Sequence, residues 1–304
     1  MRFGVHLPLM DFGDQRFDLD HLAEYVDTAI DLGFDAIAVN DHMVFATPWL
    51  DGPTALAAVV SCSADAELFT TVANPVVRGP VPLTKTLAGL DVLSGGRLTA
   101  ALGPGSSERD YASVGLPFDE RWGRFDEAVR CVRALLRGKP FEGRFYEVGA
   151  TLEPLPGTPQ GLPLWVGSWG SDVGLRRAVR VGDGWLASAY NTTPDVFGRA
   201  WGRVQEMLED HGRNPSGFGN GLATMWFHID DRRADEVFAD RLAPVMNRPA
   251  EELRGRLPFG PAEVMAERLL AFRDAGVQRV FLWPVADELE QLRRFSDQVM
   301  PALR

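Results

Sequence analysis

Residues 164–187, LWVGSWGSDVGLRRAVRVGDGWLA, predict a strand, a glycine-rich turn, a helix and a second strand. The turn at 167–171 contains two glycines and two serines, so its backbone can approach another molecule closely. Backbone N–H groups that open a helix attract anions, because they lack intrahelical acceptors and lie at the positive end of the helix dipole. Spacing alone leaves two interpretations open: the turn binds the phosphate of a cofactor, or it is an ordinary strand-to-helix loop.

The same strand-then-helix order recurs through the 304-residue chain. The expected strands are short and apolar along their length, as in a parallel sheet that helices cover from outside. Eight such units favour a (β/α)8 TIM barrel over an open doubly wound sheet, with residues 1–304 as a single domain. Two insertions are expected, a hairpin at about 141–163 and a helical segment at about 233–258. The expected strands lie at 2–8, 34–39, 68–73, 97–102, 164–166, 184–189, 221–229 and 277–283.

The amino-acid composition argues against some classes of binding partner. The formal net charge of −11 argues against nucleic acid or an anionic membrane as the main partner. The negative net charge still allows an anionic cofactor to bind, because local N–H groups and a few arginines can make the electrostatic potential positive in a cleft. The chain lacks a secretory-signal pattern, an apolar run of about 18 residues and a CxxC motif, so we expect a cytoplasmic protein that acts on a small molecule.

In such barrels the active site lies at the carboxyl ends of the strands, which here carry several polar and aromatic residues. Each has a structural and a functional interpretation. His42 either bonds local backbone or donates to a cofactor ring or a substrate, and His6 either makes a buried polar bond or takes part in catalysis. Glu108 is a first-turn helix charge or a site acid, and Trp49 and Trp283 are packing residues or part of an apolar substrate site.

A metal site is not expected. His6, His42 and His228, with Asp41, come from strands that are far apart in the ring, and no HxH or HxxxH spacing exists. No GxSxG motif indicates a nucleophilic serine either.

Several of these patterns together resemble the bacterial luciferase-like monooxygenase family of flavin- and deazaflavin-dependent barrels. LDxLSGGRL, LPFDER..RFDE and RxGDGW are specific when they occur in this order. The longer matching segments are GFDAIAVNDH (33–42), TTVANPVVRGP (70–80), TLAGLDVLSGGRLTAALGPG (86–105), GLPFDERWGRFDEAVRCVRALLRG (115–138) and LPLWVGSWGSDVGLRRAVRVGDGWL (162–186).

The resemblance implies where a flavin or coenzyme F420 would bind. It assigns the phosphate to the turn after the fifth strand, and it implies a non-prolyl cis peptide at Thr71–Val72 in a bulge behind the cofactor ring. The Asp41-His42 pair looks like the pair of F420-dependent members, in which the histidine lies by the ring. The implied cofactor-binding residues are Thr71, Val72, Ala73, Asn74, Gly103, Gly105, Val166, Gly167, Ser168, Trp169 and Gly170.

The implied function is hydride transfer between F420 and a small organic substrate, with His42, Asp41 and His6 as catalytic candidates and Trp49, Glu108 and Trp283 at the substrate. The alternative is an FMN-dependent monooxygenase that uses O₂. Rivals of other classes are a barrel that only carries a flavin and a metal-dependent hydrolase. The resemblance also suggests a homodimer.

Overall fold

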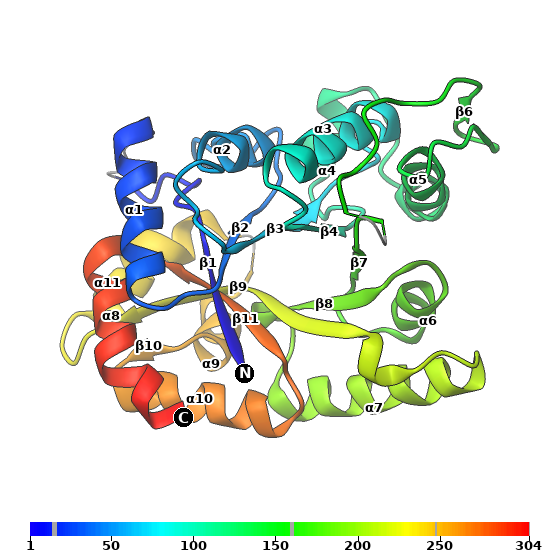
Figure 1. The fold of residues 1–304 in the computed structure, drawn as a ribbon. Helices are drawn as coiled ribbons and strands as arrows, with labels where there is room; N and C mark the ends of the chain where they lie inside the picture. Colours follow the sequence, from blue (N-terminus) through cyan, green and yellow to red (C-terminus); the bar gives the residue numbers. More distant parts are fainter. Residues whose placement is uncertain (14–16, 159–160, 247, 304) are drawn as a thin grey trace.

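The computed structural model describes residues 1–13, 17–158, 161–246 and 248–303. Eight parallel strands close into a barrel in the order β1–β2–β3–β4–β7–β8–β9–β11, and β11 pairs with β1 (Figure 1). This confirms the predicted (β/α)8 TIM barrel. The strands are β1 (Arg2–His6), β2 (Ala36–Val39), β3 (Glu67–Ala73), β4 (Leu98–Leu102), β7 (Leu164–Gly167), β8 (Gly184–Ser188), β9 (Gly219–Ile229) and β11 (Arg279–Pro284).

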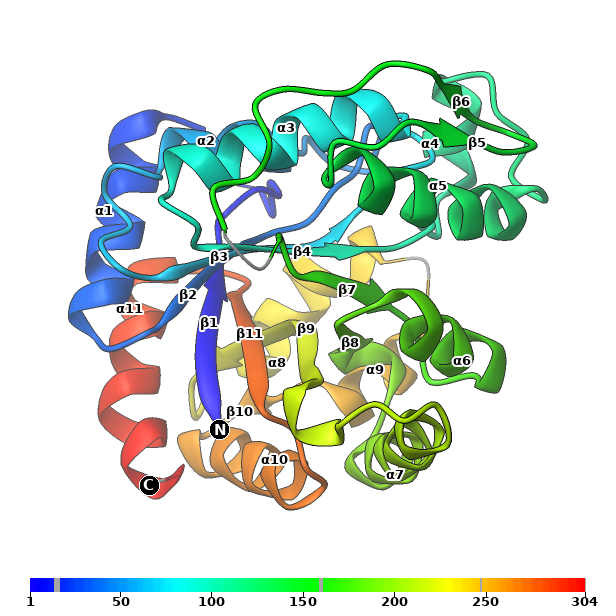
Figure 2. The ribbon, with the colours of Figure 1, turned by 45° about the vertical axis from the view of Figure 1, so that its right-hand side comes forward.

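Helices surround the barrel in both views (Figures 1 and 2). Side-chain caps begin several of them: Asp18 accepts from the backbone N–H of His21, Ser171 from Gly174 and Thr193 from Val196, which satisfies otherwise unpaired donors. The covering helices are α1 (Leu19–Asp31), α2 (Gly52–Ala58), α3 (Pro80–Leu93), α5 (Arg121–Leu135), α6 (Asp172–Val181), α7 (Pro194–Asp210), α10 (Ala262–Asp274) and α11 (Glu288–Arg294).

Shorter elements lie between these units. Strands β5 (Phe141–Glu142) and β6 (Glu147–Val148) form an antiparallel pair beside α5 (Figure 2), within the segment expected to be a hairpin. Residues 159–160 of that segment are outside the described residues, as is residue 247 of the segment expected to be helical. The latter segment contains α8 (Ala234–Val237), the π-helix η3 (Phe238–Leu242), η4 (Ala243–Val245) and α9 (Ala250–Arg256). The remaining elements are α4 (Glu108–Ser113), η1 (Ala189–Asn191), η2 (Pro215–Gly217), β10 (Phe259–Gly260), η5 (Phe295–Val299) and η6 (Met300–Leu303).

An apolar cluster fills the inside of the barrel. Its large members are Phe69, Leu186 and Phe281, which pack with small alanines from the neighbouring strands. Below them, the buried guanidinium of Arg279 contacts Phe69 and binds Asp35 and Glu67, at 2.6 and 2.9 Å. The cluster and Arg279 thus fill the barrel below the carboxyl ends of the strands. Among the described residues, no helix has the length and apolar character needed to cross a membrane.

Candidate active site

A cavity of about 410 Å³ lies at the carboxyl ends of β2, β3, β4, β7, β8 and β9. The barrel interior forms its floor, since Leu186 and Ala223 belong both to the inner cluster and to the cavity lining. Most of the expected site residues line this cavity: Asp41, His42, Thr71, Val72, Gly103, Gly105, Gly167, Ser168 and Trp169. Ala73, Asn74, Val166 and Gly170 are close in sequence to lining residues but are not among them.

The turn that opens α6 forms one end of the cavity. Trp185 Nε1 donates to the carbonyl of Ser168 at 3.0 Å, which fixes the turn, and Gly174 in the first turn of α6 lines the cavity. A side chain at Gly174 would collide with Ser168 Oγ. One turn further along α6, the guanidinium of Arg177 is 7% exposed, lines the cavity and pairs with Asp126. Helix N–H groups beside a guanidinium make this end suited to a phosphate group.

The bulge in β3 forms the wall beside that turn. The Thr71–Val72 peptide is cis, as the resemblance implied, and the pairing of β3 with β4 shifts register between Thr71 and Ala73. A Cβ atom at Gly103 would lie 2.6 Å from Val72 Cγ2, and one at Gly167 would lie 2.7 Å from Val72 Cγ1. These glycines therefore make room for the Val72 side chain. From the sequence, Gly167 was expected to let a phosphate approach its backbone. In the structure the constraint on Gly167 comes from the Val72 side chain instead.

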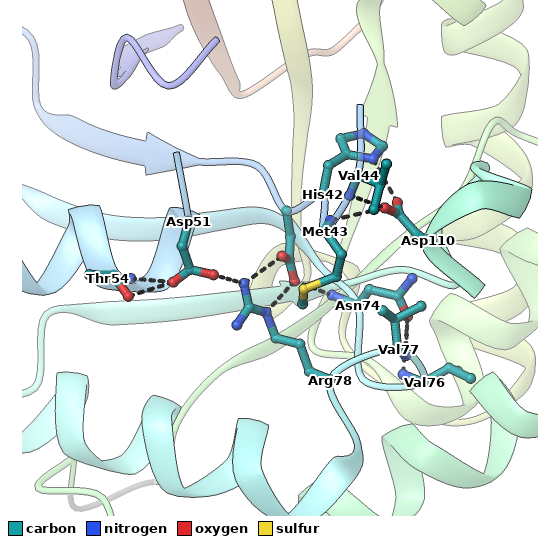
Figure 3. A network of polar contacts seen from close by, with 11 residues as sticks. His42, Met43, Val44, Asp51, Thr54, Asn74, Val76, Val77, Arg78 and Asp110 are labelled. Atoms are coloured by element: carbon teal, nitrogen blue, oxygen red, sulfur yellow. Dashed lines mark hydrogen bonds and ion pairs between the residues drawn. The ribbon is translucent and has the colours of Figure 1, made fainter. Parts of the chain in front are cut away.

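His42 lies at the other end of the cavity, and its acidic partner is a residue that the sequence did not indicate. His42 Nδ1 is 2.8 Å from Asp110 Oδ2, and Asp110 Oδ1 accepts the backbone N–H groups of Met43 and Val44 at 2.9 and 2.8 Å (Figure 3). The pair leaves His42 Nε2 without a hydrogen bond among the described residues. This geometry can hold one imidazole tautomer, with Nε2 available to a ligand.

The electrostatics of Asp110 support this arrangement. Its side chain is nearly buried, and burial by itself raises the pKa of a carboxyl group. The hydrogen bond and charge of His42, with the two backbone N–H groups, outweigh burial, so the pKa of Asp110 lies below its usual value. Asp110 is therefore ionised when it accepts these bonds.

Asp41 does not pair with His42, although the two are adjacent in sequence. Its side chain is 2% exposed and accepts two bonds from Arg78, both at 2.8 Å, and one from the backbone N–H of Asn74 at 2.9 Å. Arg78 also pairs with Asp51, the N-cap residue of α2 (Figure 3). Asp41 thus joins the loops after β2 and β3, and Arg78 is already paired with two carboxylates.

His6 lies behind the cavity lining. It is fully buried, stacks on Trp283 with ring centroids 4.5 Å apart, and accepts the Thr224 backbone N–H at Nε2. Thr71 Oγ1 is 3.3 Å from the same Nε2, and burial lowers the pKa of His6 to about 3. His6 is therefore a neutral imidazole that Thr71 and Thr224 separate from the cavity. This placement fits a positioning role and the buried polar bond, and it differs from the catalytic role that was also expected for His6.

The three residues expected at the substrate lie in different places. Glu108 is exposed in the first turn of α4 and does not line the cavity, so the structure supports its helix-charge interpretation. Trp49 packs against His42, and Trp283 packs against Trp49, with centroids 4.8 and 5.5 Å apart. Neither tryptophan is among the lining residues.

The sequence analysis did not single out several residues that line the cavity. Phe118, Arg121 and Trp122 come from one matching segment, GLPFDERWGRFDEAVRCVRALLRG, so a signal for them existed. Tyr190 and Thr224 lie outside the segments on which the resemblance was based. In the described ranges no group of three or more His, Cys, Asp or Glu residues is arranged to bind a metal ion.

The importance of Asp110 can be tested with Asp110→Asn. We expect turnover to fall by at least about 10-fold, because an amide does not hold the His42 tautomer as the carboxylate does. We also expect a loss of about 2 kcal/mol of unfolding free energy at pH 7. The depressed pKa means that this difference is present above about pH 4 and shrinks as the pH falls below it. Urea unfolding between pH 3 and 7 measures the stability difference.

The matched control for this change is Glu108→Gln, two residues away and exposed. It should alter neither turnover nor the pH dependence of unfolding. A stability difference for Asp110→Asn that stays constant down to pH 3 would contradict the assignment.

The chain is similar to proteins of a known family and to solved structures with the same fold. A family model described as luciferase-like monooxygenase matches residues 1–243. The F420-dependent glucose-6-phosphate dehydrogenase of Beutenbergia cavernae is 29% identical, over 95% of each chain. An F420-dependent secondary alcohol dehydrogenase in complex with an F420–acetone adduct has a TM-score of 0.85 at 20% identity, covering 100% of this chain and 99% of the other. A monooxygenase from Streptomyces bottropensis has the same TM-score and identity, with full coverage of both chains.

Proposed function

This chain belongs to the luciferase-like monooxygenase family, and we propose that it is an oxidoreductase that uses coenzyme F420 to transfer a hydride to or from a small organic substrate. The observation that carries the proposal is the two-ended cavity. One end presents the α6 N-terminus and Arg177, and the other presents His42 fixed by Asp110. A phosphate-bearing cofactor can bind at the first end with its reactive ring beside the imidazole.

The lining residues fit such a cofactor. Val72, Leu186 and Ala223 give an apolar surface for a flat ring, and the α6 turn gives N–H donors for a phosphate. F420 differs from FMN in its long acidic tail, which needs further positive charge. Arg121 lines the cavity over the Phe118 ring, 4.0 Å from its centroid, and forms no ion pair among the described residues. Arg121 together with Arg177 supports F420 over FMN.

The residues of this chain then have distinct tasks. F420, when bound, supplies a carbon that accepts or donates a hydride. His42 Nε2 takes the hydroxyl proton of an alcohol substrate, or returns it to a carbonyl oxygen in the reverse direction. Asp110 binds the Nδ1 proton and stabilises the charged imidazole. Trp169 and Tyr190 flank the cavity and limit the access of water.

Three further parts of the proposal concern the chain as a whole. The low cysteine content fits a cytoplasmic location, and the continuous core that covers the barrel strands fits a single domain. A homodimer is suggested by the family resemblance alone, and sedimentation velocity would test it.

Titration with F420 and with FMN, followed by absorbance and fluorescence, tests the cofactor. We expect F420 to bind more tightly than FMN. We also expect Arg177→Ala to weaken F420 binding about 10-fold, because a charge-assisted bond to the phosphate is lost. The matched control is Arg176→Ala, the exposed neighbour on the same helix, which should bind F420 as the wild type does. FMN binding without F420 affinity would overturn the choice of cofactor.

A further inference from the structure

Strand β9 departs from regular geometry where it reaches the cavity. Its pairing with β11 shifts register between Val280 and Leu282, and Thr224 has a left-handed backbone conformation with φ of 59°. A β-branched residue rarely adopts this conformation, and such residues cluster at functional sites. Side chains of a regular strand alternate between two faces, but Ala223 and Thr224 are adjacent and both line the cavity. The bulge therefore turns the Thr224 side chain toward the cavity.

A buried hydrogen bond to His6 holds Thr224 in this conformation. The backbone N–H of Thr224 donates to His6 Nε2 at 3.3 Å, so this nitrogen is an acceptor and the neutral imidazole carries its proton on Nδ1. His6 is fully buried and stacks on Trp283, which fixes the plane of its ring. Because Nε2 already accepts the Thr224 N–H, the hydroxyl proton of Thr71 is left for another acceptor.

The amide of Asn40 accepts that proton and is oriented by it. Thr71 Oγ1 donates to Asn40 Oδ1 at 3.0 Å, which turns Asn40 Nδ2 to Thr224 Oγ1 at 3.3 Å. Nδ2 has two protons and this bond uses one, whereas the Thr224 hydroxyl accepts the bond and keeps its own proton. One N–H of Asn40 and the O–H of Thr224 thus have no acceptor among the described residues. We call Asn40 and Thr224 the donor pair.

The donor pair lies at the His42 end of the cavity. Asn40 is two residues before His42 in the loop after β2, and both line the cavity. On the other side of the pair, His6 stacks on Trp283. Trp49 packs between Trp283 and His42, with ring centroids 5.5 and 4.8 Å from theirs. A ligand oxygen beside the His42 imidazole is therefore at the end of the cavity where the two donors lie.

We propose that the donor pair binds the reacting oxygen of the substrate, an alcohol or a carbonyl compound, and that His42 exchanges a proton with the same oxygen. The inference rests on the proposed function and names the residues that bind the reacting group. In the oxidation, the C–H bond of the alcohol carbon breaks, and its electron pair leaves as hydride to the cofactor. The O–H bond also breaks, its proton goes to His42, and its electron pair completes the C=O bond. The two donors bind the lone pairs of this oxygen and stabilise the negative charge that develops on it.

Two ligands of the same shape test this inference, on the protein with and without F420. Butanone has a carbonyl oxygen where 2-methyl-1-butene has a CH₂ group, and ligand-observed nuclear magnetic resonance measures the affinity of each. Thr224→Val keeps the branched shape and removes the hydroxyl, so butanone affinity should fall about 3- to 10-fold. Asn40→Asp keeps the acceptor for Thr71 and replaces the N–H donors by a carboxylate oxygen that repels the ketone, so the loss should be at least about 10-fold. The affinity for the alkene should stay within about 2-fold in both variants, because it forms no hydrogen bond with the donors.

The matched control is Thr70→Val. The Thr70 hydroxyl is buried, donates to the carbonyl of Ala101 at 2.8 Å and does not line the cavity, so this variant should bind both ligands as the wild type does. No butanone binding to the wild type, unchanged butanone affinity in both donor-pair variants, or an equal loss for butanone and the alkene would overturn the inference.

F420 titration of the same variants separates substrate from cofactor. Its affinity should stay near the wild-type value, and a loss as large as that for butanone would overturn the inference, because the donors would then bind the cofactor ring. Failure of the wild type to bind F420 would count against the proposed function alone, since the titrations without cofactor still compare the two ligands.

Discussion

Replacing His42 with alanine is expected to lower turnover about 10²- to 10⁴-fold, which is the range that a positioned acid–base group contributes. His42 lines the cavity, and its Nδ1 atom lies beside Asp110. Its Nε2 atom is left available to a substrate. Loss of this residue removes the acceptor for the substrate proton while the α6 end of the cavity stays unchanged. F420 affinity should therefore remain within a few-fold of the wild-type value.

The fold should survive His42→Ala. The His42 side chain is partly exposed, and Asp110 keeps its two bonds from Met43 and Val44, so we expect a stability loss of about 1–2 kcal/mol. Steady-state turnover, F420 titration and thermal unfolding on the same preparation separate these effects. His211→Ala, at the exposed C-cap of α7, is the control for histidine removal. Wild-type turnover in His42→Ala would remove His42 from the catalytic residues.

The barrel could be predicted from sequence because its signals are local. Most strands are short apolar runs that end at glycine, proline or asparagine, so the eight units can be counted without knowing how they pack. Boundaries shifted by only a few residues: β2 begins at Ala36 where 34 was expected, and β9 begins at Gly219 where 221 was expected. The register shift at Thr71–Ala73 followed from a family pattern, and composition alone would not have indicated it.

The site was harder to predict because its key contacts are not local. His42 and Asp110 are 68 residues apart, and only the fold brings α4 beside the loop after β2. The sequence offered Asp41, the neighbour of His42, and Glu108, two residues before Asp110. In the structure Asp41 turns to Arg78 and Glu108 turns to solvent. The sequence therefore predicted carboxylates close to the right positions. Which of them contacts His42 depends on the direction in which each side chain points.

The glycines of the site show the same limit. Gly103 was expected from the resemblance, and Gly167 was expected because a cofactor can approach its backbone, yet both positions are constrained by one side chain of this protein. Val72 projects from the β3 bulge toward β4 and β7, and each strand end lacks a Cβ where Val72 passes. The sequence shows that glycine is present, but the residue that requires it comes from another strand.

Gly167→Val should therefore weaken cofactor binding through Val72. The first added carbon would lie 2.7 Å from Val72 Cγ1 and 3.5 Å from the carbonyl oxygen of Leu102, so Val72 or β7 has to move. Such overpacking costs about 1–3 kcal/mol. If the displacement falls on the wall that supports the cofactor, F420 affinity drops about 10- to 100-fold, and Gly167→Ala should give a smaller loss in the same direction.

Fluorescence titration with F420 measures the change, and thermal unfolding shows whether the cost appears in stability instead. Gly149→Val is the matched control, because a Cβ at this exposed position meets no atom within 4 Å. The double variant Gly167→Val with Val72→Ala removes the obstructing methyl groups, so it should recover part of the affinity if Val72 transmits the effect. Wild-type affinity in Gly167→Val would place the cofactor away from Val72, and a double variant no better than Gly167→Val alone would show that the valine acts directly on the ligand.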